Sequence, residues 1–278
     1  MRCLPPLSDC PRTAWAPLRG VLTDIDDTLT GAADAGAGDE AATAATAVIA
    51  PAALEALARL DAAGVPVIAI TGRPAGWSAP FAMAWPVRGI VAENGGVLLH
   101  RQGDRLVTEF AQDDATREAN FARLQACARE ILATVPGATL ARDSAGRLTD
   151  IAIDHSEFTT LDDDAIAAVC DRMRAHGLVA TVSSIHVNGW IGEHSKWSAA
   201  HWAVKRLTGL DFVPREWVYV GDSTNDQLMF ERVPLSVGVA NIARFLPMLD
   251  HPPAYVTAGE RGDGFAEVAR ALLDARAG

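Results

Sequence analysis

Residues 21–30 read Val-Leu-Thr-Asp-Ile-Asp-Asp-Thr-Leu-Thr, an apolar run that ends in three carboxylates, Asp24, Asp26 and Asp27. The apolar part predicts a buried strand, and alternation along an extended backbone directs Asp24 and Asp26 to the same side. Ionised carboxylates cannot share a buried position unless a cation or hydrogen-bond donors offset their charge. The stretch therefore predicts a catalytic arrangement at the carboxyl end of a strand, one that needs a divalent metal or a proton.

The composition limits the class of protein. The chain has 278 residues, of which 49% are apolar, enough for one large α/β domain or for a domain with a smaller partner. The net charge of −11 argues against a nucleic-acid partner and offers no basic run for a membrane surface. An acidic protein can still bind phosphate where a metal and one or two cations invert the field locally.

The cysteines and the first residues of the chain bear on its location. Four cysteines occur without a CxxC pair, and we interpret them as free thiols in a reducing compartment: Cys3, Cys10, Cys127 and Cys170. The sequence shows neither a secretory signal nor a membrane-spanning segment. We therefore expect a cytoplasmic protein, and no pattern indicates its oligomeric state.

Alternating strands and helices predict a parallel sheet. Strands are expected over residues 19–24, 65–70, 89–92, 217–220 and 235–239, the last at an edge, and helices over residues 51–63 and 264–276. Residues 1–16, rich in proline, are expected to form a flexible leader, and residues 31–48 a mobile Gly/Ala loop. Ligands of parallel sheets gather at the carboxyl ends of the strands.

The middle of the chain has a different character. Helices are expected over residues 114–133 and 162–175, and half-exposed strands over residues 147–153 and 185–189. These elements predict a small α/β domain with its own antiparallel sheet over residues 99–189, inserted into a core of residues 17–98 and 190–278.

Polar clusters follow three of the predicted core strands, and a lysine lies on the helix-like run after the insertion. The clusters are Asp24/Asp26/Thr28, Thr71/Gly72/Arg73 and Asp222/Ser223/Asn225/Asp226, and the lysine is Lys196. A carboxylate can attack phosphorus, and a second carboxylate can protonate the leaving alcohol and then deprotonate water. Mg²⁺ prefers oxygen ligands, and an ammonium with hydroxyl and amide groups can hold the non-bridging oxygens. The set predicts phosphoryl transfer.

These residues resemble the haloacid dehalogenase-like (HAD) phosphatase superfamily over roughly residues 18–275. The resemblance rests on four ordered motifs: the DxDxT signature at residues 24–28, Thr71, Lys196, and GDSxND at residues 221–226. It implies a Rossmann-like three-layer α/β core. Dehalogenases release halide and need no acid at the second aspartate, so Asp26 favours phosphoester chemistry over carbon–halogen cleavage.

The resemblance also implies roles for single residues. Asp24 would be the nucleophile and Asp26 the general acid/base. The phosphoryl group would be bound by Thr71, Gly72, Lys196 and Asn225. Mg²⁺ would be held by Asp24, Asp222 and the main-chain carbonyl of Asp26. Support for these groups would come from Thr28, Ser223 and Asp226.

The position of the insertion is similar to the C2-type cap of the type IIB subgroup. That subgroup includes Cof-like, sucrose-phosphate, mannosylphosphoglycerate and trehalose-phosphate phosphatases and phosphomannomutases. Such caps carry substrate specificity, so the expected sugar contacts are Asn94, Ser184, His186 and Asn188. The simpler alternatives are that Asn94 serves only its turn, that the histidines are ordinary polar residues, that Arg73 is a solvated or structural charge, and that Trp190 packs in the core rather than stacking on a sugar.

The sequence thus predicts a Mg²⁺-dependent phosphomonoester hydrolase that acts on a small phosphorylated metabolite, most simply a sugar or glycoside phosphate, through a phosphoaspartate intermediate. One alternative is a phosphosugar mutase or phosphotransferase, which returns the phosphoryl group to a substrate instead of giving it to water. The other is a non-catalytic binding module on the same fold.

Overall fold

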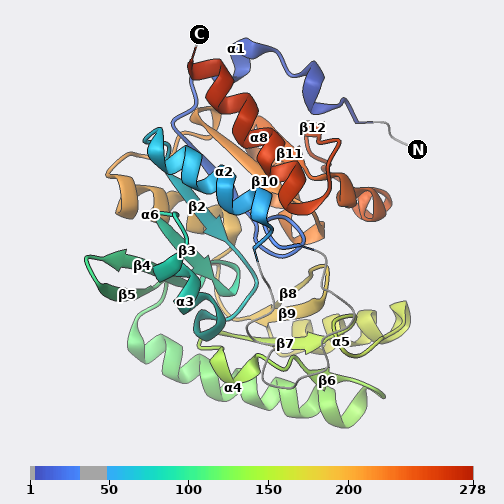
Figure 1. Cartoon of the computed structure of the whole chain (residues 1–278). Coiled ribbons are helices and arrows are strands. Elements are labelled where there is room, and N and C mark those ends of the chain that lie inside the picture. Colours follow the sequence, from blue (N-terminus) through green and yellow to red (C-terminus); the bar gives the residue numbers. More distant parts are fainter. Residues whose placement is uncertain (1–3, 32–48, 278) are drawn as a thin grey trace.

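The computed structural model describes residues 4–31 and 49–277. All but the first residue of the expected Gly/Ala loop at 31–48 lie outside the described residues. The described chain forms an eight-stranded sheet and a separate four-stranded sheet. The smaller sheet has its own helices and lies beyond one end of the larger one (Figure 1). We call residues 111–190, which contain the smaller sheet, the inserted domain.

The large sheet has the order β12-β11-β10-β1-β2-β3-β4-β5. Its parallel strands are β1 (Gly20–Thr23), β2 (Val67–Ile70), β3 (Gly89–Ala92), β10 (Trp217–Gly221), β11 (Leu235–Gly238) and β12 (Tyr255–Val256), and β4 (Val97–Gln102) and β5 (Arg105–Phe110) run antiparallel. The central strands are buried along their whole length because helices cover both faces, which explains their uninterrupted apolar runs.

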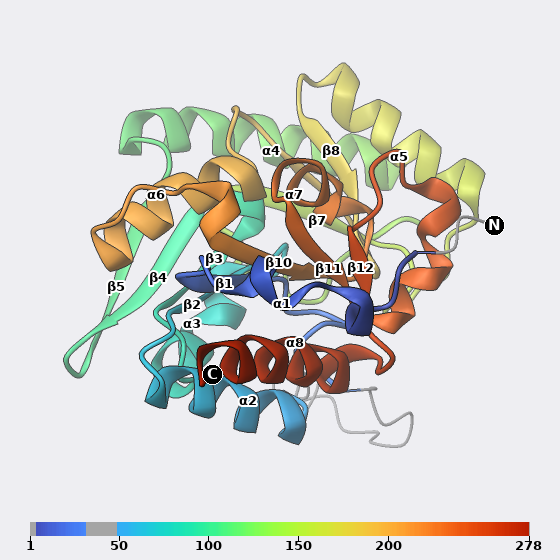
Figure 2. The same ribbon diagram turned by 90° about the horizontal axis from the view of Figure 1, so that it is seen from above.

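Helices on both faces complete three layers (Figure 2). On one face lie α2 (Pro51–Ala62), α3 (Ala75–Ala84) and α8 (Arg261–Arg276), and on the other lie α6 (Lys196–Thr208) and α7 (Gln227–Arg232). Each face has its own apolar cluster. Leu57 and Phe265 belong to the first cluster, and Ala203 and Trp217 belong to the second.

The inserted domain is an antiparallel sheet with two helices. The sheet order is β6 (Thr139–Leu140), β7 (Asp150–Asp154), β9 (His186–Trp190) and β8 (Val179–Val182), and the helices are α4 (Asp114–Thr134) and α5 (Asp163–Ala175). Ile151, Ile153 and Val187 pack with these helices in a third apolar cluster. The alternate residues, such as His186 and Asn188, point the other way.

The expectation that residues 147–153 and 185–189 form half-exposed strands is wrong. β7 and β9 are buried at every position. The alternation is real, but the polar face packs against the core: Asn188 and Arg147 both donate hydrogen bonds to the carbonyl of Gly72. At a second contact, Gly76 of α3 approaches Gly146 so closely that a Cβ at position 76 would lie 2.9 Å from the Gly146 Cα.

Two sheet predictions also need correction. Residues 99–110, expected in the inserted domain, instead form most of β4 and β5 of the large sheet, where β4 pairs with β3. β11 is not the edge strand, because β12 pairs with it on the outside. β12 spans only two residues, too short for an apolar pattern to reveal it.

The described part of the leader is ordered. Residues 4–16 contain a 3₁₀ turn (Leu7–Asp9) and the short helix α1 (Arg12–Trp15), and both Leu7 and Trp15 are buried. Pro6 and Pro11 occupy the N-cap positions, where the missing amide hydrogen costs nothing. The prolines therefore begin these elements instead of preventing them.

Two further findings concern the described residues only. Cys10, Cys127 and Cys170 form no disulfide, and Cys3 lies outside the described residues. None of the described helices is both long enough and apolar enough to cross a bilayer.

Candidate active site

The order of the large sheet brings the three predicted polar clusters together. β10, β1 and β2 are adjacent, so Asp222, Asp24 and Thr71 follow the carboxyl ends of neighbouring strands. The amide of Asp24 donates to the carbonyl of Val220 at 2.8 Å, which extends the β1–β10 ladder by one residue and fixes the Asp24 backbone. Asp24, Thr71 and Asp222 are all buried.

Lys196 joins this group from the first turn of α6. The Ser195 side chain caps the helix and accepts from the Ser198 amide, which sets the direction in which Lys196 leaves the backbone. The Lys196 Nζ lies 2.6 Å from Asp24 Oδ1 and 2.7 Å from Asp226 Oδ1. Burial lowers the pKa of Lys196, but the two carboxylates outweigh it and hold the pKa above its usual value. The ammonium therefore stays charged beside Asp24.

Asp226 is fully occupied by donors. Its Oδ1 accepts from Lys196 and from the Tyr219 hydroxyl, and its Oδ2 accepts from the amides of Asp222 and Ser223. Asn225 lies at the edge of the same cluster, with its Oδ1 3.5 Å from Lys196 Nζ and 2.9 Å from the Ser223 hydroxyl. Asp226 can therefore hold Lys196 and the 222–223 turn in place.

Asp222 differs from Asp226 in having a buried oxygen without a donor. Its Oδ1 has no hydrogen-bond partner within the described residues, and oxygens of Asp24, Asp222 and Asp226 come within 4.8 Å of one another. Burial and the Asp24 and Asp226 carboxylates raise the pKa of Asp222 well above its usual value, and burial raises that of Asp24 to about 7. Three carboxylates with one ammonium lack positive charge, so the donor set fits a hard divalent cation.

The second oxygen of Asp222 is held by residues that the sequence analysis missed. Asn241 Nδ2 and Arg244 Nη2 lie 3.3 Å and 3.4 Å from Asp222 Oδ2. Asn241 also donates to the carbonyl of Asp27, and Arg244 to its carboxylate. No motif marks these residues, because they come from a 3₁₀ turn after β11 that only the fold brings to the site.

Asp26 pairs with Arg73 instead of joining the group of Asp24, Asp222 and Asp226. Its Oδ1 accepts from Arg73 Nε at 2.8 Å, and its side chain is not among the grouped oxygens. Arg73 is buried, so the alternative of a solvated charge is wrong. Thr28 is buried, and its hydroxyl has no partner among the described side chains and backbone groups.

The 71–72 turn faces both the core and the inserted domain. The Thr71 hydroxyl accepts from the Arg73 amide at 3.0 Å. A Cβ at Gly72 would meet the amide groups of Asn94 and Asn188 at 3.3 Å and 3.4 Å, so a side chain here would crowd the turn. The structure thus places Gly72, Asn94 and Asn188 side by side.

Of the predicted sugar contacts, Asn94 keeps an unused donor. Its Nδ2 is buried without a hydrogen-bond partner in the described chain. The backbone of Asn94 lies in the left-handed region with φ 53°, so the residue also serves its turn. His186 pairs with Glu157 at 2.9 Å, and Ser184 is buried in the turn between β8 and β9. Trp190 is buried and donates to the carbonyl of His194, so it packs in the core.

Glu93 is a further residue that sequence reasoning missed. This buried carboxylate accepts from the amide of Ala75 at the start of α3 and from the amides of Leu148 and Thr149 in the inserted domain. The bonds join the core to the inserted domain directly behind the 71–73 turn. Glu93 was visible in the sequence only as part of a glycine-rich turn.

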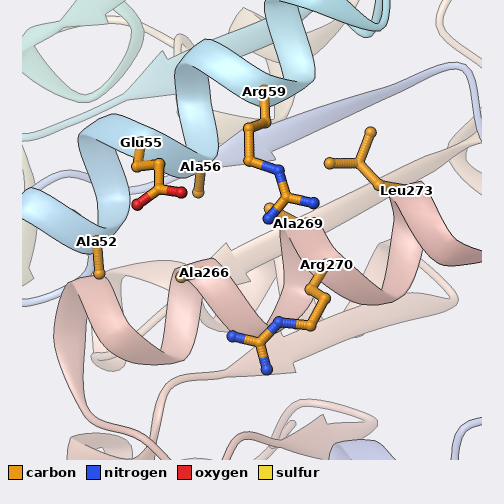
Figure 3. Close-up of a pocket in the computed structure, with 8 residues that line it drawn as sticks. All are labelled: Ala52, Glu55, Ala56, Arg59, Ala266, Ala269, Arg270 and Leu273. Atoms are coloured by element: carbon orange, nitrogen blue, oxygen red, sulfur yellow. The ribbon is translucent and has the colours of Figure 1, made fainter.

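Figure 3 shows a separate pocket between α2 and α8, lined by Ala52, Glu55, Ala56, Arg59, Ala266, Ala269, Arg270 and Leu273. All of these residues belong to the two helices, and none of the predicted site residues lines the pocket. The chemistry-bearing residues instead lie where the strand ends meet the inserted domain.

Comparison with known proteins agrees on the fold. No family model matches the sequence. No curated protein matches it either. Solved structures do match, at low sequence identity, over nearly the whole of both chains.

The C-terminal domain of trehalose-6-phosphate phosphatase from C. albicans is 14% identical, with a TM-score of 0.63 over 99% of this chain and 98% of that one. The sucrose-phosphatase of a Synechocystis species, solved with sucrose and phosphate, is 16% identical, with a TM-score of 0.62 over 92% and 98%. A haloacid dehalogenase-like hydrolase from Bacteroides thetaiotaomicron is 16% identical, with a TM-score of 0.58 over 91% and 98%. These likenesses confirm the predicted fold class, a Rossmann-like α/β core with an inserted α/β domain.

Proposed function

We propose that this chain, which has the fold of HAD-type phosphatases, is a Mg²⁺-dependent phosphomonoester hydrolase. The observation that carries the proposal is the arrangement around Asp24. A buried carboxylate at the end of β1 is held by a buried ammonium at 2.6 Å and lies beside a carboxylate oxygen of Asp222 that no described group satisfies. This arrangement supplies a fixed nucleophile, a cation for the phosphoryl oxygens and two ligands for a metal.

Asp24 and Asp222 would hold Mg²⁺, together with the main-chain carbonyl of Asp26. Asp226 lies in the same group but already accepts four hydrogen bonds, so we assign it to support. When bound, Mg²⁺ neutralises charge on the carboxylates and on the phosphoryl oxygens. Oxygen ligands and a shortage of positive charge are what this ion requires.

The chain's own residues would carry out two steps. In the first, an Asp24 oxygen attacks phosphorus, the bond from phosphorus to the ester oxygen breaks, and Asp26 gives its proton to that oxygen, which leaves as an alcohol. In the second, the ionised Asp26 takes a proton from water, the water oxygen attacks phosphorus, and the bond to Asp24 breaks to release phosphate. Lys196, Thr71 and the Gly72 turn would hold the non-bridging oxygens during both steps.

The inserted domain supports a polar organic substrate. We propose that it acts as a cap over the strand ends, because Asn188 from β9 reaches the Gly72 turn. The buried Nδ2 of Asn94, which lies beside Asn188 and has no partner among the described residues, offers a donor for a hydroxyl group. A sugar or glycoside phosphate fits such a surface, and the similar structures named for trehalose-6-phosphate and sucrose phosphatases support this substrate class.

The test is phosphate release from a panel of phosphorylated sugars by wild type and Asp24→Asn. The variant keeps the shape of the side chain but removes the nucleophile, so we expect the rate to fall by about 1,000-fold or more. Asp211→Asn is the matched control, because Asp211 is exposed and its one ion pair among the described residues is with Lys205. Unchanged hydrolysis by Asp24→Asn would refute the proposed nucleophile.

Two further arms separate the alternatives. Activity should disappear after exhaustive chelation and return with Mg²⁺, and activity that survives chelation would contradict the metal assignment. A mutase would need an added bisphosphate activator and would convert substrate without net phosphate release. A binding module would release no phosphate from any compound in the panel.

A further inference from the structure

Arg73 makes contacts that the proposed chemistry does not yet use. Its guanidinium is buried and bonds three carboxylates: Nε lies 2.8 Å from Asp26 Oδ1, Nη1 3.4 Å from Asp143 Oδ2, and Nη2 3.1 Å from Glu157 Oε1. The guanidinium also lies 5.0 Å from the centre of the Trp77 ring, which restricts its position. Each of the three guanidinium nitrogens therefore has a carboxylate partner.

The three carboxylates come from different parts of the molecule. Asp26 belongs to the core and follows β1, whereas Asp143 precedes a 3₁₀ turn of the inserted domain and Glu157 follows β7. Arg73 itself follows β2 of the core. The residue thus joins the proposed proton carrier to the inserted domain.

The two carboxylates of the inserted domain are themselves fixed. Arg147 Nη2 lies 3.2 Å from Asp143 Oδ1, and His186 Nε2 lies 2.9 Å from Glu157 Oε2. Burial raises the pKa of Glu157, but His186 and Arg73 outweigh it and bring the pKa down to about 2. Glu157 therefore stays ionised and holds Arg73 at Nη2, while Asp26 is bound at Nε.

We propose that Arg73 is the positioning residue for Asp26 and that Asp143 and Glu157 complete this positioning only while the inserted domain lies against the core. Within residues 4–31 and 49–277, Arg73 is the only hydrogen-bond donor to the Asp26 carboxylate. If the inserted domain moved away from the core, Arg73 would keep one of these three carboxylate partners, Asp26. The inference rests on the proposed hydrolase function. It adds that contact between the inserted domain and the core orients the Asp26 carboxyl group.

The inference predicts a loss that depends on the leaving group. A sugar alkoxide needs the Asp26 proton to leave, whereas p-nitrophenolate leaves without one. A mutation that only disturbs folding or phosphate binding would lower both rates equally. A mutation that misdirects Asp26 would lower the rate on the sugar phosphate far more.

The experiment compares wild type, Arg73→Gln and Arg270→Gln on p-nitrophenyl phosphate and on the sugar phosphate that wild type hydrolyses fastest. We expect Arg73→Gln to lower kcat on the sugar phosphate by about 100-fold, which is the lower end of the contribution of a general acid. On p-nitrophenyl phosphate we expect kcat to fall by only about 10-fold. Arg270, exposed on α8, is the matched control and should change neither rate. Equal losses on the two substrates would overturn the inference.

A second pair of variants tests the link to the inserted domain. Glu157→Gln should show the same leaving-group dependence more weakly, and the double variant Arg73→Gln/Glu157→Gln should lose no more than Arg73→Gln alone. Fully additive losses would refute the link. If Arg73→Gln does not fold, Arg73→Lys replaces it. Lysine keeps the positive charge but cannot bind three carboxylates with the geometry of a planar guanidinium.

Failure of the proposed function gives a different result from failure of this inference. If wild type releases no phosphate from any substrate, the hydrolase assignment fails. If wild type hydrolyses both substrates and Arg73→Gln loses activity on them equally, the hydrolase assignment stands and Arg73 is not a positioning residue.

Discussion

Asp222 and Asp226 lie four residues apart, but their carboxylates differ in how far hydrogen-bond donors satisfy them. Both are buried, yet Asp226 accepts four hydrogen bonds while Asp222 Oδ1 accepts none from the described residues. A buried carboxylate is stable only when donors or cations satisfy it. The difference assigns Asp226 to the scaffold and Asp222 to a ligand that residues 4–31 and 49–277 do not supply.

His194 presents a related case in the segment that leads from β9 to α6. Both of its ring nitrogens are buried without partners in the described chain, and burial lowers its pKa to about 4. The folded protein therefore keeps the ring neutral, whereas the unfolded chain takes up a proton as the pH falls through 6.5. The stability that His194 contributes is present above pH 6.5 and is lost between pH 6.5 and about 4.

We predict that His194→Gln flattens the acid side of the stability curve. Between about pH 7.5 and about pH 5, the wild-type His194 should cost about 2 kcal/mol of unfolding free energy, and the variant should not show this loss. Urea unfolding at the two pH values measures the difference. His251→Gln, at an exposed histidine, should behave as wild type. A variant with the full wild-type pH dependence would show that His194 is not the group responsible.

At the scale of elements, the start of α6 positions the ammonium of the site. Lys196 is the first residue of α6, and the reciprocal capping bonds between Ser195 and Ser198 fix the first turn. The same turn lies next to the Glu93–Gly95 3₁₀ turn, where a Cβ on Gly95 would meet the Ser195 carbonyl at 2.5 Å. The bonds that begin helix α6 therefore also fix the position of the Lys196 ammonium.

We predict that Ser195→Ala lowers both stability and activity. Loss of the cap should cost about 1 kcal/mol of unfolding free energy, and a frayed first turn should lower kcat because Lys196 loses its fixed position. Asp113→Ala is the matched control, since Asp113 caps α4 in the same way but lies far from Lys196 in the chain. The control should lose similar stability and keep its kcat. Equal kcat in the two variants would contradict the role of the α6 cap.

At the scale of the whole molecule, the charge at the strand ends influences the folding equilibrium. The carboxyl groups of Asp24, Asp222 and Asp226 are buried close together at the strand ends. A cation that binds only the folded state offsets this repulsion and stabilises the protein by mass action.

We predict that Mg²⁺ raises the unfolding free energy of wild type by about 2.7 kcal/mol when free Mg²⁺ is about 100 times its Kd. Asp222→Asn should be more stable than wild type in the presence of a chelator, because it removes one repelling charge, and it should not respond to Mg²⁺. Thermal unfolding with and without Mg²⁺ measures both effects without an activity assay. A response of Asp222→Asn equal to that of wild type would place the metal elsewhere.

Local patterns were sufficient for much of this protein. The strands β1, β2, β3 and β10, the helices α4 and α5 and the polar residues that follow the strands were predictable, because each depends on contiguous residues. Parallel strand ends share one edge of a sheet, so the sequence by itself determined that Asp24, Thr71 and Asp222 would meet there.

Only the tertiary structure decided which charged groups face one another. Arg73 meets Asp26 across 47 residues and Glu157 across 84, and Glu93 meets Thr149 across 56. No periodicity encodes such pairs, since they depend on how the inserted domain packs on the core. The same packing buried the polar faces of β7 and β9 that the alternation marked as half-exposed. The sequence determined the chemical groups at the strand ends, and the fold determined which partners hold them.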